Sequence, residues 1–594
     1  MAEDDMRVKN TSKRRQGGQA IVMFTLLVSS VLIPMVGLAI DGGRGYLVRL
    51  KLSSAVDGGA LAAARLLGSG SNAAQQLSMA KATAAQFVNA NFPAKFFGAS
   101  LSGAANVCVD PGTDSSDPCG VGNGSGISTY KVRTVAVKAT ATMPTLFMRI
   151  IGMPTVTVSG SGTASRRDVR VILVMDRSSS MGTYYSGINQ TPPSINDMAL
   201  KFVNSFSGAG EFGGRDEVGL VVYGGSGIVA YPPRDITKDY TDYTKFTPPD
   251  NNFKASGNIP KYIADITSGS NTGTAEALYL AYMTLRADAA TNPDLATKLN
   301  VIVLFTDGIP NGVTAMANDK TIANQHYLMI PNCTNLGLGD TSRTPMLSGS
   351  PNPNIAGWFA QWGGNSYTDN SGPHGFHKPM MAYADTGYTG KGDDIDSYMK
   401  NPGHDGGKID QMTGTGCTAD PMVGELNKLP DHDIYGNYLN LSAAPAVSGL
   451  TPPVGSAGAL YKLGTLYSTS TQCNNSSYNP SAPDNACQMG LGSWQAAAHQ
   501  AWKIWNQIIW DKATQTNIPD PATNKASPVI FTIGFESTAS DLPDMKLLQL
   551  IANDPSSPAP FSTRVQGKAY NAKDPNAVDA AFQQIRSEIL RLSR

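Results

Sequence analysis

The strongest hydrophobic pattern in the chain is an uncharged apolar run near its N-terminus. From Ala20 to Ile40 the sequence reads AIVMFTLLVSSVLIPMVGLAI. A helix rises about 1.5 Å per residue, so about 20 apolar residues cross a hydrocarbon core of about 30 Å. Five basic residues come before the run, namely Arg7, Lys9, Lys13, Arg14 and Arg15. By the positive-inside rule we expect a cytoplasmic tail at 1–19, a single-pass anchor at 20–40 and the remaining chain outside the cytoplasm.

A cleaved signal peptide is the alternative reading of this run. Gly37, Leu38 and Ala39 offer a cleavage site of small residues. The apolar part of a signal peptide is usually about 7–15 residues long, however, and this run is longer. An uncleaved anchor is therefore the favoured prediction.

After the anchor, the spacing of apolar residues is first helical and then alternating. Two helical stripes are predicted, one at Tyr46, Leu50, Ala60, Ala64 and Leu67, and one at Leu77, Ala80, Ala84, Phe87 and Val88. Val135, Val137, Ala139 and Ala141 then recur at every second position, which predicts a strand with one buried face. A second alternating run follows at 155–159. We expect residues 41–166 to form a small helical stalk with a β element.

From residue 168 the pattern changes to short, continuous apolar runs separated by amphipathic helices. The runs are 169–175, 218–223, 300–305 and 529–535, and continuous apolar strands are typical of a parallel sheet buried on both faces. The helical stripes between and after them are Met198/Phe202/Phe206, Leu278/Ala281/Tyr282/Leu285 and Val578/Phe582/Ile585/Ile589/Leu592. This alternation predicts an α/β domain over 168–594, with a doubly wound, mostly parallel sheet.

Residues from about 312 to 491 interrupt that pattern. The stretch is rich in Gly, Asn, Asp and Pro and has no long periodic run, so we expect a loop-rich insertion in the domain. It is predicted to end in a helix that carries Trp494, Ala498, Ala501, Trp505, Ile508 and Ile509. All six cysteines follow the anchor, which suggests disulfides in an oxidising compartment. Proximity in the sequence favours Cys108–Cys119 and Cys473–Cys487 and leaves Cys333 with Cys417, although six cysteines allow 15 pairings.

The net charge and the absence of common catalytic motifs restrict the classes of function that the sequence supports. Lys plus Arg and Asp plus Glu both number 46, so a zero net charge gives no reason to expect a nucleic-acid partner. The sequence has no HExxH, P-loop, dinucleotide-binding glycine motif or GxSxG elbow. Its HGFH and DHD segments are expected to be solvated loops. We therefore predict that the protein is not an enzyme.

One set of oxygen-bearing residues follows three of the predicted core elements. The first core strand ends in VMDRSSSM, which places Asp176, Ser178 and Ser180 in a D-x-S-x-S arrangement. Thr272 precedes a helix, with Ser270 as its rival, and Asp307 ends another core strand. In a parallel sheet the carboxyl ends of the strands share one edge, so these side chains should converge there. Hydroxyl and carboxylate oxygens are the ligands that Mg²⁺ prefers.

This ordered set resembles the metal-ion-dependent adhesion site of von Willebrand factor type A domains. The resemblance implies Mg²⁺ (or Mn²⁺ or Ca²⁺), with Ser178 and Ser180 as direct ligands. Thr272 would bind the metal directly or through water, and Asp176 and Asp307 mostly through water. An acidic side chain of a protein partner would complete the coordination. Because these residues were expected on loops outside the core, Asp176→Ala should abolish metal binding without unfolding the domain.

The N-terminal part carries a second resemblance. Residues 14–67, which read RRQGGQAIVMFTLL and onward, together with the β stretch at 134–165, resemble TadG-like proteins of bacterial tight-adherence (Flp) pilus assembly. Related pseudopilins usually have a Glu early in the apolar run, where this chain has Met23 and Thr25. The likeness implies a protein of the bacterial inner (cytoplasmic) membrane that is associated with pilus or secretion components.

Two functions follow as hypotheses. The first is a membrane-anchored, metal-dependent adhesion protein, and the second is a structural component of an envelope complex that has no external ligand. Because the insertion starts a few residues after Asp307, we also expect it to emerge beside the metal and to set which partner binds. The alternative is a decorative loop that folds away down the side of the domain.

Overall fold

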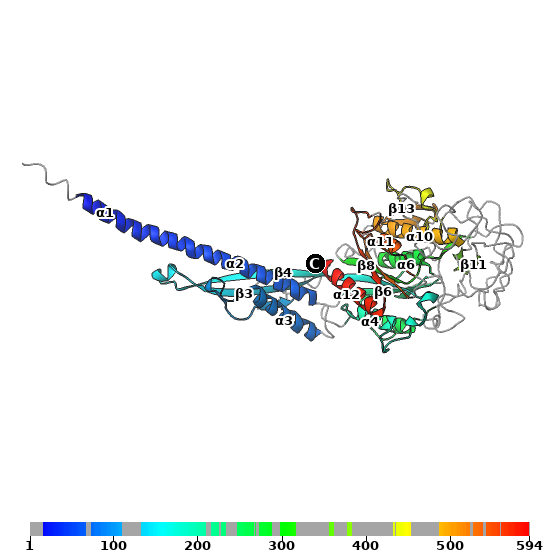
Figure 1. Cartoon of the computed structure of the whole chain (residues 1–594), viewed down its shortest axis with the longest axis horizontal. Helices are drawn as coiled ribbons and strands as arrows, with labels where there is room; N and C mark the ends of the chain where they lie inside the picture. The colour runs from blue at the N-terminus through cyan, green and yellow to red at the C-terminus, as the bar shows by residue number, and fades with distance from the viewer. Residues whose placement is uncertain are drawn as a thin grey trace, which may run out of the picture. The chain divides into compact units, whose positions relative to one another are not determined.

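The chain divides into two compact units, residues 1–166 and 167–593. In the computed structural model the described residues are 16–66, 73–109, 132–209, 215–224, 227–232, 246–266, 268, 272–287, 298–316, 356–360, 377–382, 432–433, 435–452, 486–511, 513–522, 527–537, 542–558 and 560–592. Figure 1 labels the helices and strands of both units.

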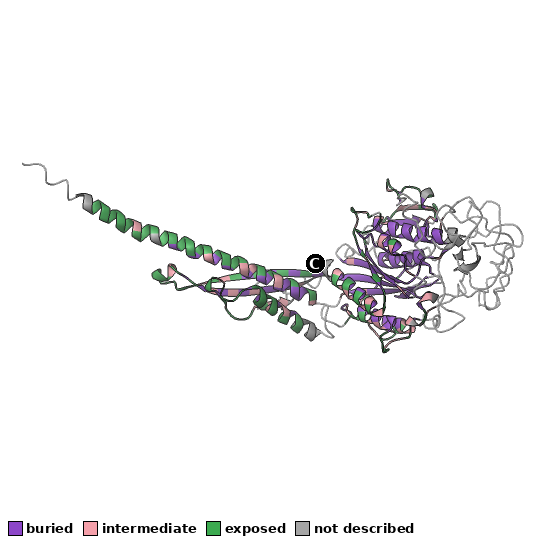
Figure 2. Ribbon diagram, viewed as in Figure 1, coloured by how far each residue is buried: buried purple, intermediate pink, exposed green. Residues whose placement is uncertain are grey.

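The first unit begins with a long helix. Its consecutive parts are α1 (Gln16–Leu27), a π-helical turn η1 (Val28–Leu32) and α2 (Ile33–Leu66). Within the described chain, one helix, Gln19–Leu66, is long and apolar enough to cross a membrane. Most side chains of the apolar run are exposed, as Figure 2 shows by colour. The predicted apolar helix is confirmed, and it continues without a break into the segment that packs on the rest of this unit.

A second helix and a small sheet pack against α2. They comprise α3 (Ala73–Asn91), η2 (Phe96–Gly98), β1 (Ser100–Leu101), β2 (Asn106–Val109), β3 (Val132–Pro144), η3 (Met148–Ile151) and β4 (Thr155–Arg167). β3 pairs with β1, β2 and β4. The predicted inward face of β3 is confirmed, because Val135, Val137, Ala139 and Ala141 are all buried.

The predicted inward face of α2 was wrong in its first part. Tyr46 and Leu50 are exposed, and the buried face begins instead at Gly37, Asp41 and Gly45. It continues through Val48, Leu52, Ala55, Val56, Ala60, Ala63 and Ala64. A stripe that starts with glycine and aspartate does not look apolar in the sequence, yet small residues are what allow another backbone to approach a helix closely. On α3, Ala80, Ala84 and Val88 are buried as predicted, whereas Phe87 is exposed.

Cys108 on β2 is disulfide-bonded. Its predicted partner, Cys119, lies outside the described residues, as do Cys333, Cys417 and Cys473. Cys487 lies in a helix of the second unit, but its side chain is not among those described. The pairing therefore stays a prediction.

The second unit is built on a six-stranded sheet in the order β15-β14-β8-β5-β6-β7. The strands are β5 (Val169–Asp176), β6 (Glu217–Tyr223), β7 (Gly227–Tyr231), β8 (Leu299–Thr306), β14 (Val529–Phe535) and β15 (Lys568–Ala572). All neighbours are parallel except β6 and β7. The four strands predicted from apolar runs are confirmed, and edge strands β7 and β15 were not predicted.

Helices cover both faces of this sheet (Figure 1). One face packs on α4 (Ile195–Asn204), α5 (Ile259–Asp265) and α12 (Pro575–Leu592). The other packs on α6 (Thr274–Arg286), α10 (Ala486–Asn506) and α11 (Met545–Ile551). The prediction of a doubly wound, mostly parallel α/β sheet is therefore confirmed.

Local sequence explains where two of these helices begin. Ser194 and Asp197 form a reciprocal capping box at the start of α4. Asp574 accepts a hydrogen bond from Ala577 N at 2.9 Å, and Pro575 fills the first turn of α12, where no backbone donor is needed. The two helices meet through Phe202 and Phe582, whose ring centroids are 5.0 Å apart.

Parts of the insertion are described. β9 (Gly312–Met316), β10 (Ala356–Ala360) and β11 (His377–Ala382) form an antiparallel three-stranded sheet. Residues 435–452, which include the 3₁₀ turn η9 (Leu441–Ala443), pack Tyr435, Leu439, Leu441 and Val447 into the same core as α6 and α10. This last segment has little regular structure, as a loop-rich insertion should, yet it is part of the domain core.

The helix that ends the insertion is shorter than predicted. α10 stops at Asn506, and Ile508 and Ile509 belong to β12 (Ile508–Asp511), which pairs with β13 (Thr516–Pro519). Gln507 has a positive φ of 55°, which ends the helix between the two elements. The apolar spacing alone could not detect this change, because Ile508 and Ile509 are buried in the same core from the strand.

Candidate metal centre

The predicted site lies at the carboxyl ends of β5 and β8, where the strand order of the sheet reverses. β5 and β8 are parallel neighbours at the centre of the sheet, and Met175 of β5 is aligned with Phe305 of β8. The strands that follow β5, namely β6 and β7, lie on one side of this pair. The strands that follow β8, namely β14 and β15, lie on the other side. The connections leave such a pair of strands in opposite directions, which opens a crevice at their carboxyl ends where α/β proteins bind ligands. Asp176 and Asp307 emerge side by side at this point.

Three oxygen atoms of the D-x-S-x-S turn and Asp307 form a compact triangle. Ser178 Oγ is 3.1 Å from Asp307 Oδ1, and Ser180 Oγ is 2.9 Å from the same atom. The two hydroxyl oxygens are 3.0 Å apart. Since both hydroxyls donate to the carboxylate, the lone pairs on their oxygens remain for another group.

Thr272 joins the triangle from the loop before α6. Its backbone N–H donates to Asn311 Oδ1 at 2.8 Å, and its carbonyl accepts from Asn311 N at 3.1 Å. The side chain lies next to Gly308, because a Cβ atom at that glycine would be 3.1 Å from Thr272 Oγ1 and 3.9 Å from Ser178 Oγ. The threonine hydroxyl therefore faces the same small space as Ser178. Ser270, the rival for this position, lies outside the described residues.

Asp176 holds the turn in place. Its Oδ1 accepts from Ser178 N at 2.8 Å and its Oδ2 from Thr306 Oγ1 at 2.5 Å, while Tyr185 OH donates to its backbone carbonyl at 2.5 Å. Both Asp176 and Asp307 are fully buried. The expectation that these carboxylates lie on loops outside the core was therefore wrong.

Three residues of the site were missed in the sequence. Thr306, Asn311 and Tyr185 position the predicted ligands without belonging to the motif. Thr306 and Asn311 stand in the segment FTDGIPN that also holds Asp307, so a polar residue next to the motif was the available signal. No such sequence signal marked Tyr185, because its contact with Asp176 depends on the fold of η4 (Ser179–Tyr184).

Burial and a second carboxylate set the electrostatics of the site. Burial, followed by the negative charge of Asp307, raises the pKa of Asp176 to about 7. Burial and the two carboxylates together also raise the pKa of Tyr185 well above its ordinary value. Two buried carboxylates at one point are costly unless a positive charge lies between them. A cation would relieve both effects.

The donor set fits a hard divalent cation. Two oxygen ligands at right angles, each about 2.1 Å from a Mg²⁺ ion, are about 3.0 Å apart. The hydroxyl oxygens of Ser178 and Ser180, the expected direct ligands, are 3.0 Å apart, which matches two neighbouring positions of such an octahedron. Among the described residues no three His, Cys, Asp or Glu side chains gather into a metal site. The candidate site has two carboxylates, and its other oxygen ligands are hydroxyls, so it is not a site of that kind.

The two histidines whose side chains are described, His432 and His499, lie elsewhere. His499 is buried in α10, where its Nδ1 accepts from Tyr438 N at 3.1 Å. In the DHD segment Asp433 is buried and accepts bonds from Tyr435 N and Asn437 N, so the expectation of a solvated loop was wrong there. The HGFH segment lies mostly outside the described residues.

We expect metal affinity to depend on pH through Asp176. Its pKa in the folded state is about 7, above the ordinary 3.8, so the metal-free protein takes up a proton on folding between these values. Below about pH 7 the proton competes with the cation, and Mg²⁺ affinity should fall up to about tenfold per pH unit. In the metal-free protein the free energy of unfolding should decrease as the pH rises from 3.8 to about 7, because the folded state still holds this proton whereas the unfolded state has lost it.

Titration calorimetry with Mg²⁺ between about pH 5.5 and 8 checks this expectation. Asp176→Asn is the matched control, because asparagine keeps one of the two acceptor oxygens and does not titrate. A wild-type affinity that is constant over this range would contradict the role of Asp176.

Comparison with known proteins bears mainly on the N-terminal segment. Residues 18–66 match the family described as putative Flp pilus-assembly TadE/G-like. No curated protein matches the chain. Two solved structures are similar at low levels. The PilB minor pilin from Streptococcus sanguinis has a TM-score of 0.30 and 11% identity, covering 84% of this chain and 79% of its own. A von Willebrand factor type A protein from Catenulispora acidiphila has a TM-score of 0.16 and 13% identity, covering 30% of each chain. The segment that includes the apolar helix is thus similar to the putative TadE/G-like family of Flp pilus assembly.

Proposed function

We propose that the second unit binds one divalent cation, Mg²⁺ or Mn²⁺, and uses it to capture an acidic side chain of a protein partner. The N-terminal helix would anchor this binding unit in the bacterial inner membrane, with the chain after residue 40 outside the cytoplasm. The TadE/G-like match at 18–66 supports a role beside Flp-type pilus assembly. On this proposal the protein is an adhesion or docking protein and not an enzyme.

The observation that carries the proposal is the oxygen triangle at the β5–β8 crevice. Ser178 and Ser180 present hydroxyl oxygens 3.0 Å apart, the spacing of neighbouring Mg²⁺ ligands, and Asp307 accepts a hydrogen bond from each of them. The strand order of the sheet places this triangle where α/β folds bind ligands. The motif order and its position in the sheet resemble a von Willebrand factor type A domain.

Each residue has a distinct task in this mechanism. Ser178 and Ser180 would hold the cation with neutral oxygens, and Thr272 would approach from the facing loop. Asp307 would orient both serine hydroxyls, while Asp176 fixes the turn through Ser178 N and Thr306. A cation held by few direct charges stays electrophilic and can accept a carboxylate from a partner, which is the chemistry that the ion supplies.

The second candidate is a structural part of an envelope complex that has no external ligand. The hydrogen bonds that tie Ser178 and Ser180 to Asp307 favour it, because they join β5 to β8 without any ion. In that case the site only stabilises the domain.

A pull-down from envelope extract with the full-length protein tests the proposal. We expect a partner to be retained in Mg²⁺, released by EDTA, and absent with Ser178→Ala, which removes one ligand but keeps the turn. Ser205→Ala, which removes a partly buried hydroxyl bonded only to Phe202 O among the described contacts, is the matched control and should behave as wild type. Retention that EDTA and Ser178→Ala both leave unchanged would favour the structural candidate. Surface labelling of intact cells then shows whether the second unit reaches the exterior, as an adhesin must.

A further inference from the structure

The first unit has an apolar tip that none of the assignments above explains. Residues 145–154, here called the hairpin tip, connect β3 to β4. Thr145 closes its base, since Thr145 N donates to Pro154 O at 3.1 Å and Thr145 Oγ1 to Met153 O at 2.6 Å. Between these residues the chain forms the single turn η3. The tip is therefore a closed and ordered loop.

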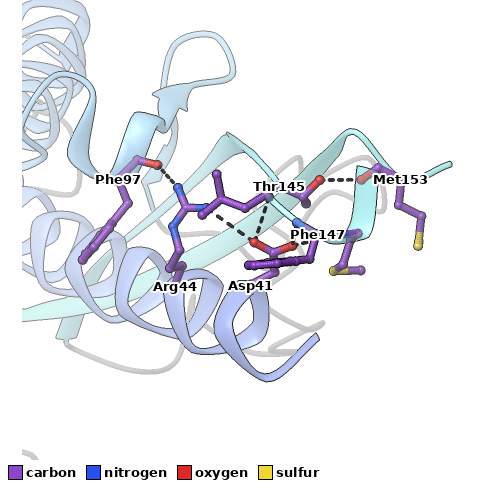
Figure 3. Close-up of polar contacts among 8 residues, drawn as sticks. Asp41, Arg44, Phe97, Thr145, Phe147 and Met153 are labelled. Atoms are coloured by element: carbon purple, nitrogen blue, oxygen red, sulfur yellow. Dashed lines mark hydrogen bonds and ion pairs between the residues drawn. The ribbon is translucent and has the colours of Figure 1, made fainter. Parts of the chain in front are cut away.

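Asp41 fastens the hairpin tip to the membrane helix. Its carboxylate accepts three backbone N–H bonds from the tip, from Leu146 at 2.9 Å and from Phe147 and Met148 at 2.8 Å each. Arg44 supports this carboxylate at 3.4 Å and donates to Phe97 O at 2.9 Å, as drawn in Figure 3. Asp41 is buried by these contacts. It is also the first residue after the apolar run 20–40.

Phe147 reaches still further along the helix, to a level inside the apolar run. A Cβ atom at Gly37 would lie 2.5 Å from Phe147 Cβ and 2.6 Å from Phe147 Cγ, so only glycine allows this approach. Gly37 lies three residues before the end of the apolar run, which is about 4–5 Å along a helix. A run of 21 residues only just spans a hydrocarbon core of about 30 Å. The hairpin tip is therefore held at the outer boundary of the hydrocarbon.

The side chains that the hairpin tip turns outward suit that boundary. Leu146, Ile150, Ile151 and Met153 are 53%, 79%, 66% and 50% exposed. Large apolar side chains gathered on a short loop mark a surface that contacts something other than water. Arg149 is exposed among them, and an arginine can bury its aliphatic stem while its guanidinium stays among headgroups.

We propose that the hairpin tip inserts into the outer leaflet of the membrane crossed by the N-terminal helix. It would act as a second membrane contact, with Ile150 and Ile151 about 5–10 Å into the headgroup–acyl boundary. One helix alone leaves a protein free to tilt and to rotate about its axis. A second contact fixed to that helix by Asp41 and Phe147 restricts both motions. The inference rests on the membrane anchor of the proposed function and is independent of the metal site.

Photo-crosslinking of the full-length protein in nanodiscs of phosphatidylcholine and phosphatidylglycerol tests the proposal. The photoreactive residue p-benzoyl-phenylalanine replaces Ile150 in one variant. It replaces Val31 in a second, because that position is exposed within the apolar run. It replaces Ser161 in a third, an exposed position on β4 that lies about 25 Å along the strand from the tip. All three positions are exposed, so the substitutions should not disturb folding.

Mass spectrometry of the products gives the result. We expect lipid adducts at positions 150 and 31 and none at position 161. Adducts at 31 without adducts at 150 would overturn the insertion of the tip while leaving the anchor intact. Protein adducts at 150 in place of lipid would assign the tip to a second copy of the chain and also overturn it. Absence of lipid adducts at all three positions would overturn the tip proposal together with the anchor.

Discussion

Asp307→Asn is expected to lower Mg²⁺ affinity by roughly 100-fold or more while the second unit stays folded. Asparagine keeps an oxygen that can accept from Ser178 and Ser180, so the link between β5 and β8 survives. What is lost is one of the two negative charges that attract the cation. The metal-free variant should be at least as stable as the wild type, because the buried repulsion between Asp176 and Asp307 is removed.

Titration calorimetry and thermal unfolding, each with and without Mg²⁺, measure the two effects separately. Asp216→Asn is the matched control, since Asp216 is equally buried but binds Val169 N and Ser207 N at the other end of β5. Its metal affinity should equal that of the wild type. Unchanged affinity in Asp307→Asn would refute the site, whereas loss of folding in that variant would show that the charge of Asp307 is structural. Asp176→Ala is a poorer test than the sequence suggested, because it would leave Thr306 and Ser178 N without their acceptor in a buried place.

Replacement of residues 361–376 by a short Gly/Ser linker should abolish or broaden partner selectivity and leave Mg²⁺ affinity unchanged. The reason lies in the register of the three-stranded sheet. Gly312, Ala360 and His377 form one row of this sheet. Gly312 directly follows Asn311, which holds Thr272 by two hydrogen bonds. The connection between β10 and β11 thus begins and ends in the row next to the metal centre.

The opposite connection provides the control. Met316, Ala356 and Ala382 form the far row, so replacing residues 317–355 changes a segment that starts and ends about 13 Å further along the strands. That variant should keep both metal and partner binding. Removal of all of 315–488 is unsuitable, because it deletes Tyr435, Leu439 and Leu441 from the core. Equal partner binding in both linker variants would show that the insertion does not determine specificity.

The fold of the second unit was readable from the sequence because its signals are local. A strand buried on both faces needs an unbroken apolar run, and β5, β6, β8 and β14 each have one. The two edge strands, β7 and β15, have weaker patterns because an edge strand has only one neighbour to pack beside. Similarly, α4, α6 and α12 carried stripes that the structure buries.

The proximity of the candidate ligands was predictable from the strand pattern as well. Once β5 and β8 are parallel neighbours, residues at their carboxyl ends must meet, however far apart they are in the sequence. Asp176, Ser178, Ser180 and Asp307 are brought together in this way, and Thr272 joins them through its hydrogen bonds with Asn311.

The sequence by itself determined the apolar helix, the strand and helix pattern, and the order of oxygen-bearing residues along the chain. Only the tertiary structure decided which face of α2 is buried, because Gly37, Asp41 and Gly45 face a hairpin more than 90 residues away in the chain. It also decided that Asp176 and Asp307 are buried, and that Thr306 and Asn311 position the site. Periodicity reports how one segment divides between core and solvent, whereas these features depend on which distant segment supplies the contact.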